Sequence, residues 1–206
     1  MLITVDGPAG VGKGTIAQML AAHYRFVYLD TGLLFRRMAY FLIENKVPVD
    51  VPEHVQKCLK DFDLSETVAE NRLRQDDVSQ AASQISIYDF VRASQLEAQK
   101  AFLVAHGDVV MDGRDLGAYA FPGADKKLFL EARPEVRAKR RIHDLEKRGL
   151  EGDYDEILKS IINRDQRDRT RTHAPLKAAP DALIIDTSDL TIEAVFQKAR
   201  AFVETK

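Results

Sequence analysis

The sequence has a single cysteine, no tryptophan and no long apolar run, and its formal net charge is only −2 over 206 residues. One cysteine, Cys58, cannot form an internal disulfide, and no paired cysteine spacing indicates a zinc site. No apolar stretch approaches the ~18 residues that cross a bilayer, and the first residues carry no basic leader. We therefore expect a cytoplasmic protein without a membrane partner.

The near-neutral charge excludes a surface tuned as a whole to nucleic acid, for which a strongly basic balance is expected. Any site for anions must therefore be local, and we expect no nucleic-acid partner. The five histidines are scattered, and none accompanies a serine or cysteine in a recognisable nucleophile motif. The length and the 45% hydrophobic composition suit one domain with one substantial core. We expect a monomer.

Five short apolar runs, several of them β-branched, are predicted to be buried strands. They cover residues 2–5, 27–29, 108–111, 127–130 and 183–185. Segments with helical periodicity separate the runs, and this alternation predicts a parallel sheet covered on both faces. The expected class is therefore α/β, with a five-stranded parallel sheet flanked by helices. An apolar stripe after Thr191 predicts a last helix that closes the core, with Thr191 as its N-cap.

Two stretches are too long to be simple crossovers. Residues 31–106 are helical and polar in pattern, and residues 133–180 are rich in arginine. Excursions at the carboxyl ends of parallel strands are where α/β proteins place ligands, so we expect an acceptor-binding insertion and a lid. The prediction is one domain, with its core in residues 1–30, 107–132 and 181–206.

A glycine-rich turn follows the first predicted strand and opens a helix. It reads Gly7-Pro8-Ala9-Gly10-Val11-Gly12-Lys13-Gly14-Thr15. Glycines let the backbone wrap so that successive N–H groups point inward, and the helix N-terminus adds about half a positive charge where phosphates sit. Lys13 would reach the β- and γ-phosphates, so this loop is predicted to bind ATP. The alternative, a turn that binds nothing, does not explain why strand, spacing, lysine and helix agree.

Gly14 departs from the generic phosphate-loop pattern, in which Ser or Thr follows the lysine directly. Here Thr15 comes one position later, and it is our candidate for the hydroxyl on the Mg²⁺ side. The arrangement GxxGxGKGT is typical of nucleoside monophosphate kinases, and the resemblance implies a P-loop NTPase fold. By itself the loop does not separate a kinase from a GTPase or an ATPase motor.

Four further segments carry distinctive motifs. They read Asp30-Thr31-Gly32-Leu33-Leu34-Phe35-Arg36, Ala81-Ala82-Ser83-Gln84 with Val91-Arg92, Asp112-Gly113-Arg114-Asp115, and Arg164-Asp165-Gln166-Arg167-Asp168-Arg169-Thr170-Arg171 followed by Ala174-Pro175-Leu176. These segments resemble motifs of the cytidylate kinases. With the phosphate loop, five motifs stand in family order along nearly the whole chain. The resemblance implies ATP-dependent phosphorylation of CMP and dCMP, with Mg²⁺ bridging the phosphates, in pyrimidine nucleotide metabolism.

The resemblance also implies which residues bind the acceptor nucleotide. The phosphate would be bound by Arg36, Arg114 and Arg171, and Thr31 stands at the start of the motif that carries Arg36. The base would be bound by Ser83, Arg92 and Asp115, and the sugar by Arg164 and Asp168. The chemistry fits, because a guanidinium clamps two phosphate oxygens and a carboxylate accepts from the N4 amino group of cytosine. Without the resemblance, Arg36 could lie on a solvated helix face and Asp115 could cap a loop.

The predicted catalytic set is Lys13, Asp112, Arg114 and Arg167. Asp112 ends an apolar strand, where an acid is expected to orient Mg²⁺-bound water. During phosphoryl transfer, charge spreads over the γ-phosphate oxygens, and an arginine there stabilises it. Arg167 is the lead candidate for that position.

Arg137 and Arg141 are the next candidates for contact with ATP. Helical spacing predicts that Arg164, Asp168 and Arg171 lie on one helix face, where they can meet a single ligand. Two other interpretations of the arginine-rich stretch remain open, namely a solvated helix with pairs such as Asp165 and Arg169, or a nucleic-acid patch. Interleaved aspartates argue against the patch because they repel a polyanion.

The stretch after the second predicted strand departs from the family. The family usually has a short β-sheet there, and residues 64–78 are too few for all of it, which leaves the geometry of base recognition open. Two other functions also stay open: a kinase for another nucleoside monophosphate or small metabolite, and a nucleotide-binding regulator with little turnover.

Overall fold

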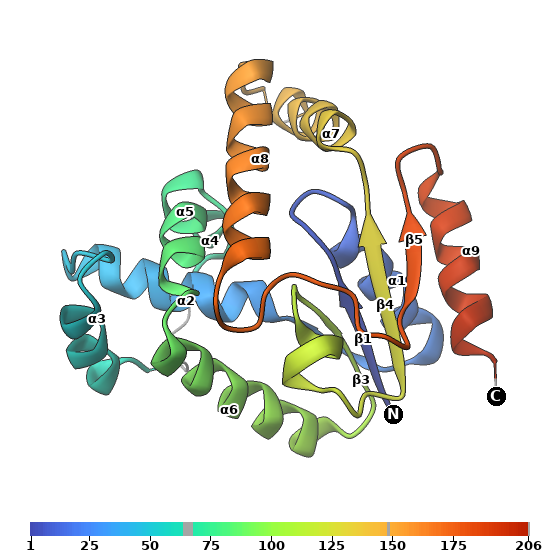
Figure 1. Cartoon of the computed structure of the whole chain (residues 1–206), viewed down its shortest axis with the longest axis horizontal. Helices are drawn as coiled ribbons and strands as arrows, with labels where there is room; N and C mark the ends of the chain where they lie inside the picture. Colours follow the sequence, from blue (N-terminus) through green and yellow to red (C-terminus); the bar gives the residue numbers. More distant parts are fainter. Residues whose placement is uncertain (64–67, 148, 206) are drawn as a thin grey trace. The chain divides into compact units, whose positions relative to one another are not determined.

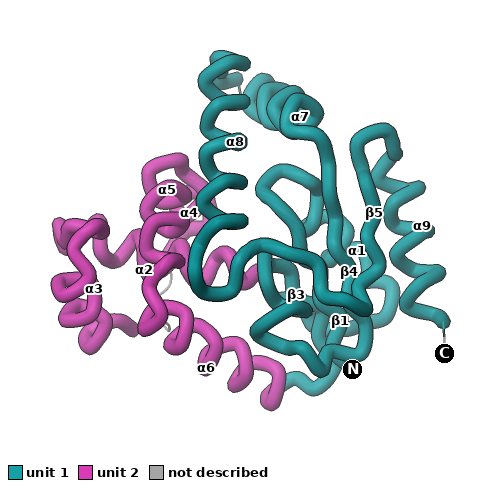
Figure 2. The backbone as a smooth tube through the Cα atoms, viewed as in Figure 1, with its two compact units in different colours: residues 1–29, 106–206 teal, residues 30–105 magenta. Residues whose placement is uncertain are grey.

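The computed structural model describes residues 1–63, 68–147 and 149–205. The chain divides into two compact units, residues 1–29 with 106–206 and residues 30–105 (Figure 2). The expectation of a single kinase domain stays a prediction.

A parallel sheet of five strands, in the order β2-β3-β1-β4-β5, lies at the centre of the first unit (Figure 1). The strands are β1 (Leu2–Asp6), β2 (Val27–Asp30), β3 (Val109–Asp112), β4 (Lys126–Glu131) and β5 (Leu183–Asp186). β1 pairs in parallel with both β3 and β4, so their carboxyl ends lie at one edge of the sheet. All five predicted strands and the α/β class are confirmed, and each strand extends one residue further, to an acid, than its apolar run.

The core of this unit lies between the sheet and two helices, α1 (Lys13–Tyr24) and α9 (Ile192–Val203). Ile3 and Val5 of β1 pack there with Leu20 of α1 and Val195 of α9. The predicted N-cap of α9 is confirmed, because the Thr191 hydroxyl accepts from the Ala194 amide at 3.2 Å. These contacts fix the start of α1, and with it the phosphate loop, against the strand ends.

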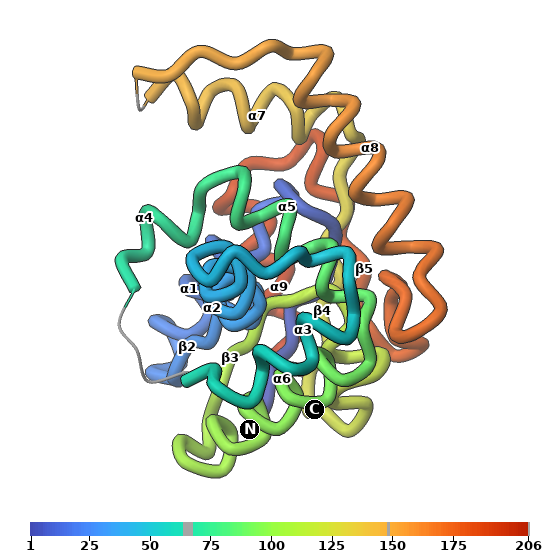
Figure 3. The backbone as a smooth tube through the Cα atoms, turned by 90° about the vertical axis from the view of Figure 1, so that its left-hand side faces the viewer, coloured from blue at the N-terminus to red at the C-terminus, as the bar shows by residue number. Residues whose placement is uncertain are grey.

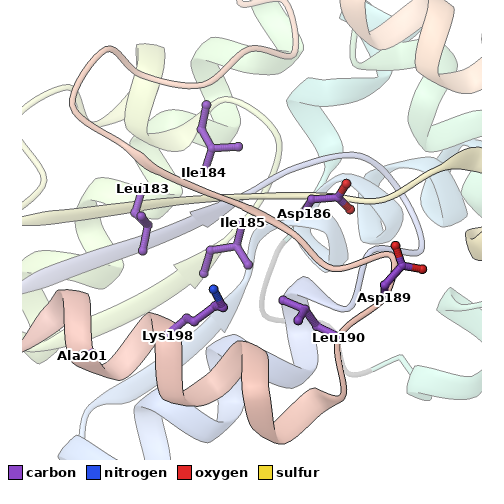
Figure 4. A pocket seen from close by; sticks show the side chains of 8 residues that line it. All are labelled: Leu183, Ile184, Ile185, Asp186, Asp189, Leu190, Lys198 and Ala201. Atoms are coloured by element: carbon purple, nitrogen blue, oxygen red, sulfur yellow. The ribbon is translucent and has the colours of Figure 1, made fainter.

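Two helices of the arginine-rich stretch, α7 (Pro134–Glu146) and α8 (Tyr154–Thr170), pack side by side (Figures 1 and 3). One turn of π-helix, η2 (Leu116–Ala120), comes after β3. Along the edge strand β5, a hollow of 630 Å³ is lined by that strand, the loop after it and α9, and 54% of Ile184 is exposed there (Figure 4).

The second unit is helical. It contains α2 (Thr31–Glu44), α3 (Pro52–Cys58), a short 3₁₀ helix η1 (Leu59–Asp61), α4 (Glu70–Leu73), α5 (Asp76–Ile85) and α6 (Asp89–His106), whose last residue belongs to the first unit. α2 packs on α5 through an apolar core that includes Met38, Leu42, Val78 and Ile85. Of residues 64–78, which we predicted to be too few for the family's sheet, residues 64–67 lie outside the described part.

No helix within the described ranges is long and apolar enough to cross a membrane.

Candidate active site

The glycine-rich loop connects Asp6, the last residue of β1, to Lys13, the first residue of α1, as the sequence predicts. Gly7 has φ of 145°, and a Cβ at this position would lie 2.1 Å from the Leu130 carbonyl oxygen of β4. Gly12, the N-cap of α1, has φ of 92°. Only glycine accommodates the close approach at Gly7, and both φ angles favour glycine.

Lys13 is buried, and its Nζ donates to the Pro8 carbonyl at 2.8 Å. Burial lowers the pKa of Lys13 well below its ordinary value, the positive charge of Arg114 lowers it further, and the negative charge of Asp112 opposes both. Arg164 also lowers this pKa. The predicted catalytic residues Lys13, Asp112 and Arg114 therefore share one electrostatic environment.

Asp112 is buried at the end of β3, and its carboxylate accepts from the Tyr28 hydroxyl of β2 at 2.6 Å. A Cβ on Gly14 would lie 3.4 Å from the same hydroxyl. Tyr28 thus sits beside both the first turn of α1 and Asp112, whereas Thr15 is exposed on that turn. The motifs did not single out Tyr28, although a tyrosine in a strand run signals a hydroxyl that needs a partner.

Asp6 is a second residue that the motifs did not single out. Its buried carboxylate accepts from the backbone amides of Leu116 at 3.0 Å and Gly117 at 2.7 Å. Burial raises the pKa of Asp6 to about 7, and the two hydrogen bonds oppose this shift. An acid directly after a buried strand is the signal that also marked Asp112. Asp6 anchors the segment that comes after Arg114 and Asp115.

The Asp112–Asp115 turn meets the end of α8 through two ion pairs. Arg114 Nε lies 3.3 Å from Asp168 Oδ2, and Arg171 Nη2 lies 3.0 Å from Asp115 Oδ1. Asp115 and Asp168 are both buried. The structure therefore brings together four predicted substrate-binding residues from two distant motifs.

The predicted position of Arg171 on a helix face is wrong. Helical spacing predicted that it shares a helix face with Arg164 and Asp168, but α8 ends at Thr170 and Arg171 has extended backbone (φ −60°, ψ 143°). Its Nε donates to the Ala174 carbonyl at 2.7 Å, which holds the guanidinium toward Asp115. The turn, rather than the helix face, positions this arginine.

The other arginines of the stretch divide into two groups. Arg164 and Arg167 of α8 and Arg141 of α7 are half-buried. Arg137 is only 2% exposed, and all three of its guanidinium nitrogens donate to protein oxygens, those of Ala132, Ala9 and Asp165. Arg137 is therefore placed to hold protein groups rather than to contact ATP.

In the second unit, Asp30 caps α2 by accepting from the Leu33 amide at 3.2 Å. Thr31 is therefore the first helical residue, and it is buried. Arg36 lies one turn further along α2 and is half-buried. The other carboxylate oxygen of Asp30 pairs with Arg74 at 3.3 Å, so the entry to α2 is held from two sides.

α5 and α6 of the second unit carry polar groups in buried positions. The Ser83 hydroxyl of α5 has no hydrogen-bond partner within the described residues, although Ser83 is 5% exposed. Arg92 Nη1, near the start of α6, donates to the Ser86 carbonyl at 3.4 Å. One turn later, both amide atoms of buried Gln95 also lack a partner in the described part of the chain. Sequence patterns did not single out Gln95, because glutamine in a helix carries no signal of its burial.

Within the described ranges, no group of three or more histidine, cysteine, aspartate or glutamate side chains could hold a metal ion.

Comparisons with known proteins agree with these motifs. Residues 3–205 match the model of the family described as cytidylate kinase. A cytidylate kinase of Mesorhizobium japonicum is 42% identical over 202 residues, which cover 98% of this chain and 93% of that protein. One of Bartonella henselae is 40% identical over 203 residues, covering 98% and 94%.

Among solved structures, a shikimate kinase from Bacteroides thetaiotaomicron superposes with a TM-score of 0.52 at 14% identity, covering all of this chain and 99% of the other. That likeness concerns the fold, which is therefore shared with a P-loop kinase as predicted. The match over residues 3–205 and the relatives at about 40% identity show that the chain belongs to the cytidylate kinase family.

Proposed function

We propose that the protein transfers the γ-phosphoryl group of ATP to CMP and dCMP, forming ADP with CDP or dCDP. The observation that carries this proposal is the cluster at the carboxyl ends of β1 and β3, where Lys13, Asp112 and Arg114 share one electrostatic environment. The family match supports the same reaction.

ATP would bind to the loop of residues 7–15. Amides of the loop and the N-terminus of α1 offer hydrogen bonds and partial positive charge to the phosphates, and Lys13 adds a full charge once a phosphate takes the place of the Pro8 carbonyl. Arg167 would stabilise the charge on the transferring group. No side chain needs to form a covalent intermediate, because direct transfer depends on positioning and electrostatics.

The oxygens of Thr15 and Asp112 fit Mg²⁺, which prefers hard oxygen ligands. Mg²⁺ usually takes one or two protein ligands, with water and substrate phosphates completing its shell, so a three-residue cluster is not required. The Tyr28 hydroxyl orients the Asp112 carboxylate. When bound, the ion would neutralise charge on the β- and γ-phosphates.

We further propose which residues bind the acceptor nucleotide. Arg114 and Arg171 would hold its phosphate, Asp115 its base, and Arg164 and Asp168 its sugar. Thr31 and Arg36 are further candidates for the phosphate, and Ser83 and Arg92 for the base. The buried Ser83 hydroxyl without a partner in the described part of the chain supports this assignment, because an unpaired buried polar group is costly unless a ligand satisfies it.

An acceptor panel tests the proposal. ADP release from ATP and Mg²⁺ is measured with CMP, dCMP, UMP, AMP, GMP and small phosphorylatable metabolites, one at a time. We expect CMP and dCMP to give the highest kcat/KM. If they are the poorest acceptors, the acceptor assignment is wrong, and if ATP binds tightly but no acceptor is phosphorylated, the protein is a regulator.

We also propose that the enzyme acts as a cytoplasmic monomer on free nucleotides. Sedimentation analysis of the purified protein and fractionation of cells test the two parts.

A further inference from the structure

Two arginines of α7, Arg137 and Arg140, lie three residues apart on one side of the helix. Arg137 contacts the phosphate loop directly, and Arg140 is linked to the loop through a third residue. Arg137 Nη1 donates directly to the Ala9 carbonyl at 3.1 Å. Arg140 acts through Thr187, in the segment after β5. Its Nη1 donates to the Thr187 hydroxyl at 3.1 Å, and that hydroxyl donates to the Val11 carbonyl at 3.3 Å. The two contacts fall on alternate carbonyls of the loop.

The orientation of a carbonyl fixes the orientation of the next amide. A trans peptide is planar, and its C=O and N–H point in opposite directions. The structure has no cis peptide in the described ranges. Because the Ala9 carbonyl points toward Arg137, the Gly10 amide points away from Arg137, and the Gly12 amide likewise points away from Thr187.

Both contacts are made by buried side chains. Arg137 and Thr187 are each 2% exposed. A Cβ on Gly10 would lie 3.4 Å from the Arg137 Cβ, so the glycine packs directly on the stem of this arginine. Arg140 also holds Thr187 from a second side, because its Nη2 donates to the Thr187 carbonyl at 2.6 Å. Neither carbonyl can therefore turn without breaking a hydrogen bond to a buried side chain.

Arg137 also holds α8. Its Nη1 and Nη2 form a two-pronged ion pair with the Asp165 carboxylate, at 3.0 and 2.5 Å. Asp165 lies between Arg164 and Arg167 on α8. A planar guanidinium can make all these bonds at once, whereas a lysine ammonium cannot reproduce the fork.

We propose that Arg137 is a positioning residue that sets the amides of the phosphate loop and the arginines of α8 on one rigid frame, with Thr187 and Arg140 as its counterpart at Val11. Arg137 touches neither nucleotide. It acts by turning the Gly10 amide toward the phosphates, while Thr187 turns the Gly12 amide. The inference rests on the proposed function, because it assigns the loop to ATP.

The test compares Arg137→Lys and Thr187→Val with a matched control. Arg133 and Asp189 form a similar two-pronged ion pair, at 2.9 and 2.7 Å, between the segments after β4 and β5. This pair is exposed, and within the described residues its hydrogen bonds do not involve the phosphate loop. Arg133→Lys therefore removes the same fork without disturbing the Ala9 carbonyl. Mg²⁺-ATP binding is measured by calorimetry, and the loop amides are observed by ¹⁵N–¹H NMR.

We expect Arg137→Lys to weaken ATP binding at least fivefold and to shift the Gly10 amide signal more than that of Gly12. Thr187→Val should weaken ATP binding about threefold and shift Gly12 more than Gly10. For the control Arg133→Lys, the dissociation constant for ATP should stay within twofold of the wild-type value. Asp165→Asn keeps the Ala9 contact, so it should lower kcat at least fivefold while the dissociation constant for ATP stays within twofold.

The inference is overturned if Arg137→Lys and Thr187→Val fold and bind ATP as the wild type does, or if the control loses as much affinity as they do. If Arg137→Lys does not fold, Thr187→Val and Asp165→Asn decide by the same measurements. The wild type is first assayed with ATP and CMP. An inactive wild type contradicts the proposed function, whereas an active wild type with unaffected variants contradicts only the inference about Arg137.

Discussion

Single side chains at the strand ends decide the chemistry that the first unit can perform. Asp112 and Asp6 are both buried acids at the ends of adjacent parallel strands, yet their partners differ. Asp112 accepts from a hydroxyl, while Asp6 accepts from two backbone amides. The first arrangement orients a carboxylate for the proposed Mg²⁺ site, and the second holds a turn in place.

Removal of the Tyr28 hydroxyl should weaken the response to Mg²⁺. A hydrogen bond to a carboxylate contributes ~1.5–3 kcal/mol, and part of this orients Asp112, so Tyr28→Phe should raise the Mg²⁺ concentration needed for half-maximal rate about threefold to tenfold. Direct titration with Mn²⁺ in the presence of ATP, followed by electron paramagnetic resonance, should show the same loss of affinity.

Tyr119→Phe provides the control, because Tyr119 keeps its ring contact with Lys177 after the change. The role of Tyr28 is contradicted if the two variants respond to Mg²⁺ and Mn²⁺ alike.

Asp6 should make the folded protein less stable as the pH rises from about 4 to about 7. The pKa of Asp6 is raised from 3.8 to about 7, so between these pH values the folded protein holds a proton that the unfolded chain has released. The free energy of unfolding contributed by Asp6 is then highest near pH 4 and decreases until about pH 7, by ~1.4 kcal/mol for each pH unit. Ionisation of a buried acid in the folded state is the cause.

Asp6→Asn removes this contribution. The difference in unfolding free energy between the wild type and the variant should therefore be larger at pH 5 than at pH 8, when both are unfolded in urea. A difference that stays constant between pH 5 and pH 8 would contradict the raised pKa, because it would show that Asp6 is ionised in the folded protein throughout this range. Asp189→Asn, at an exposed acid, controls for the change in net charge.

At the scale of elements, every strand of the sheet ends on an acid, and the role of that acid depends on the loop or helix that its carboxylate contacts. Besides Asp6 and Asp112, these acids are Asp30, Asp186 and Glu131. Asp30 of β2 caps α2, and Asp186 of β5 accepts from the Ser188 amide at 2.8 Å. The Glu131 carboxylate of β4 lies 3.8 Å from the Arg169 guanidinium. The sheet therefore presents carboxylates along one edge, and the neighbouring loops and helices neutralise or use them.

The approach of the phosphate loop to β4 gives a prediction at this scale. Gly7→Ala would place a methyl group 2.1 Å from a backbone oxygen of Leu130, and overpacking together with the strained φ should cost about 3 kcal/mol or more. Thermal unfolding should show a melting temperature lowered by several degrees, together with weaker ATP binding.

Gly123→Ala is the matched control, because a Cβ at Gly123 meets nothing within 4 Å and its φ is not positive. The packing argument fails if the two alanine variants have the same melting temperature.

For the whole chain, the proposed recognition of the acceptor base involves Asp115, which pairs with Arg171 across 56 positions of the sequence. Asp115→Asn keeps an oxygen that can accept from Arg171, but it replaces the other carboxylate oxygen with a donor. A donor suits the O4 carbonyl of uracil better than the N4 amino group of cytosine.

We therefore expect Asp115→Asn to lower kcat/KM for CMP at least tenfold, to shift the ratio of CMP to UMP activity toward UMP, and to leave the KM for ATP within twofold. Steady-state assays with both acceptors measure all three quantities, and Asp189→Asn serves as the control. An equal loss for CMP and ATP would argue against a role in reading the base.

The amino-acid sequence was sufficient to predict the five strands, the helix after the phosphate loop and the family, because these depend on short apolar runs, glycine spacing and motifs that are contiguous in the chain. It also marked Asp112, Arg114 and Asp168 as candidates, since their residue types and positions within motifs suffice.

The hydrogen-bond and ion-pair partners of these side chains follow from the packing of distant segments. Asp6 meets Gly117 across 111 positions, Arg137 meets Ala9 across 128, and Arg171 meets Asp115 across 56. The sequence offered Arg137 as a further candidate for contact with ATP and placed Arg171 on a helix face, because a pattern of charges gives the type of each group but not its direction. Burial and the packing of distant segments fix which oxygen each nitrogen contacts, and neither hydrophobic periodicity nor a short motif contains that information.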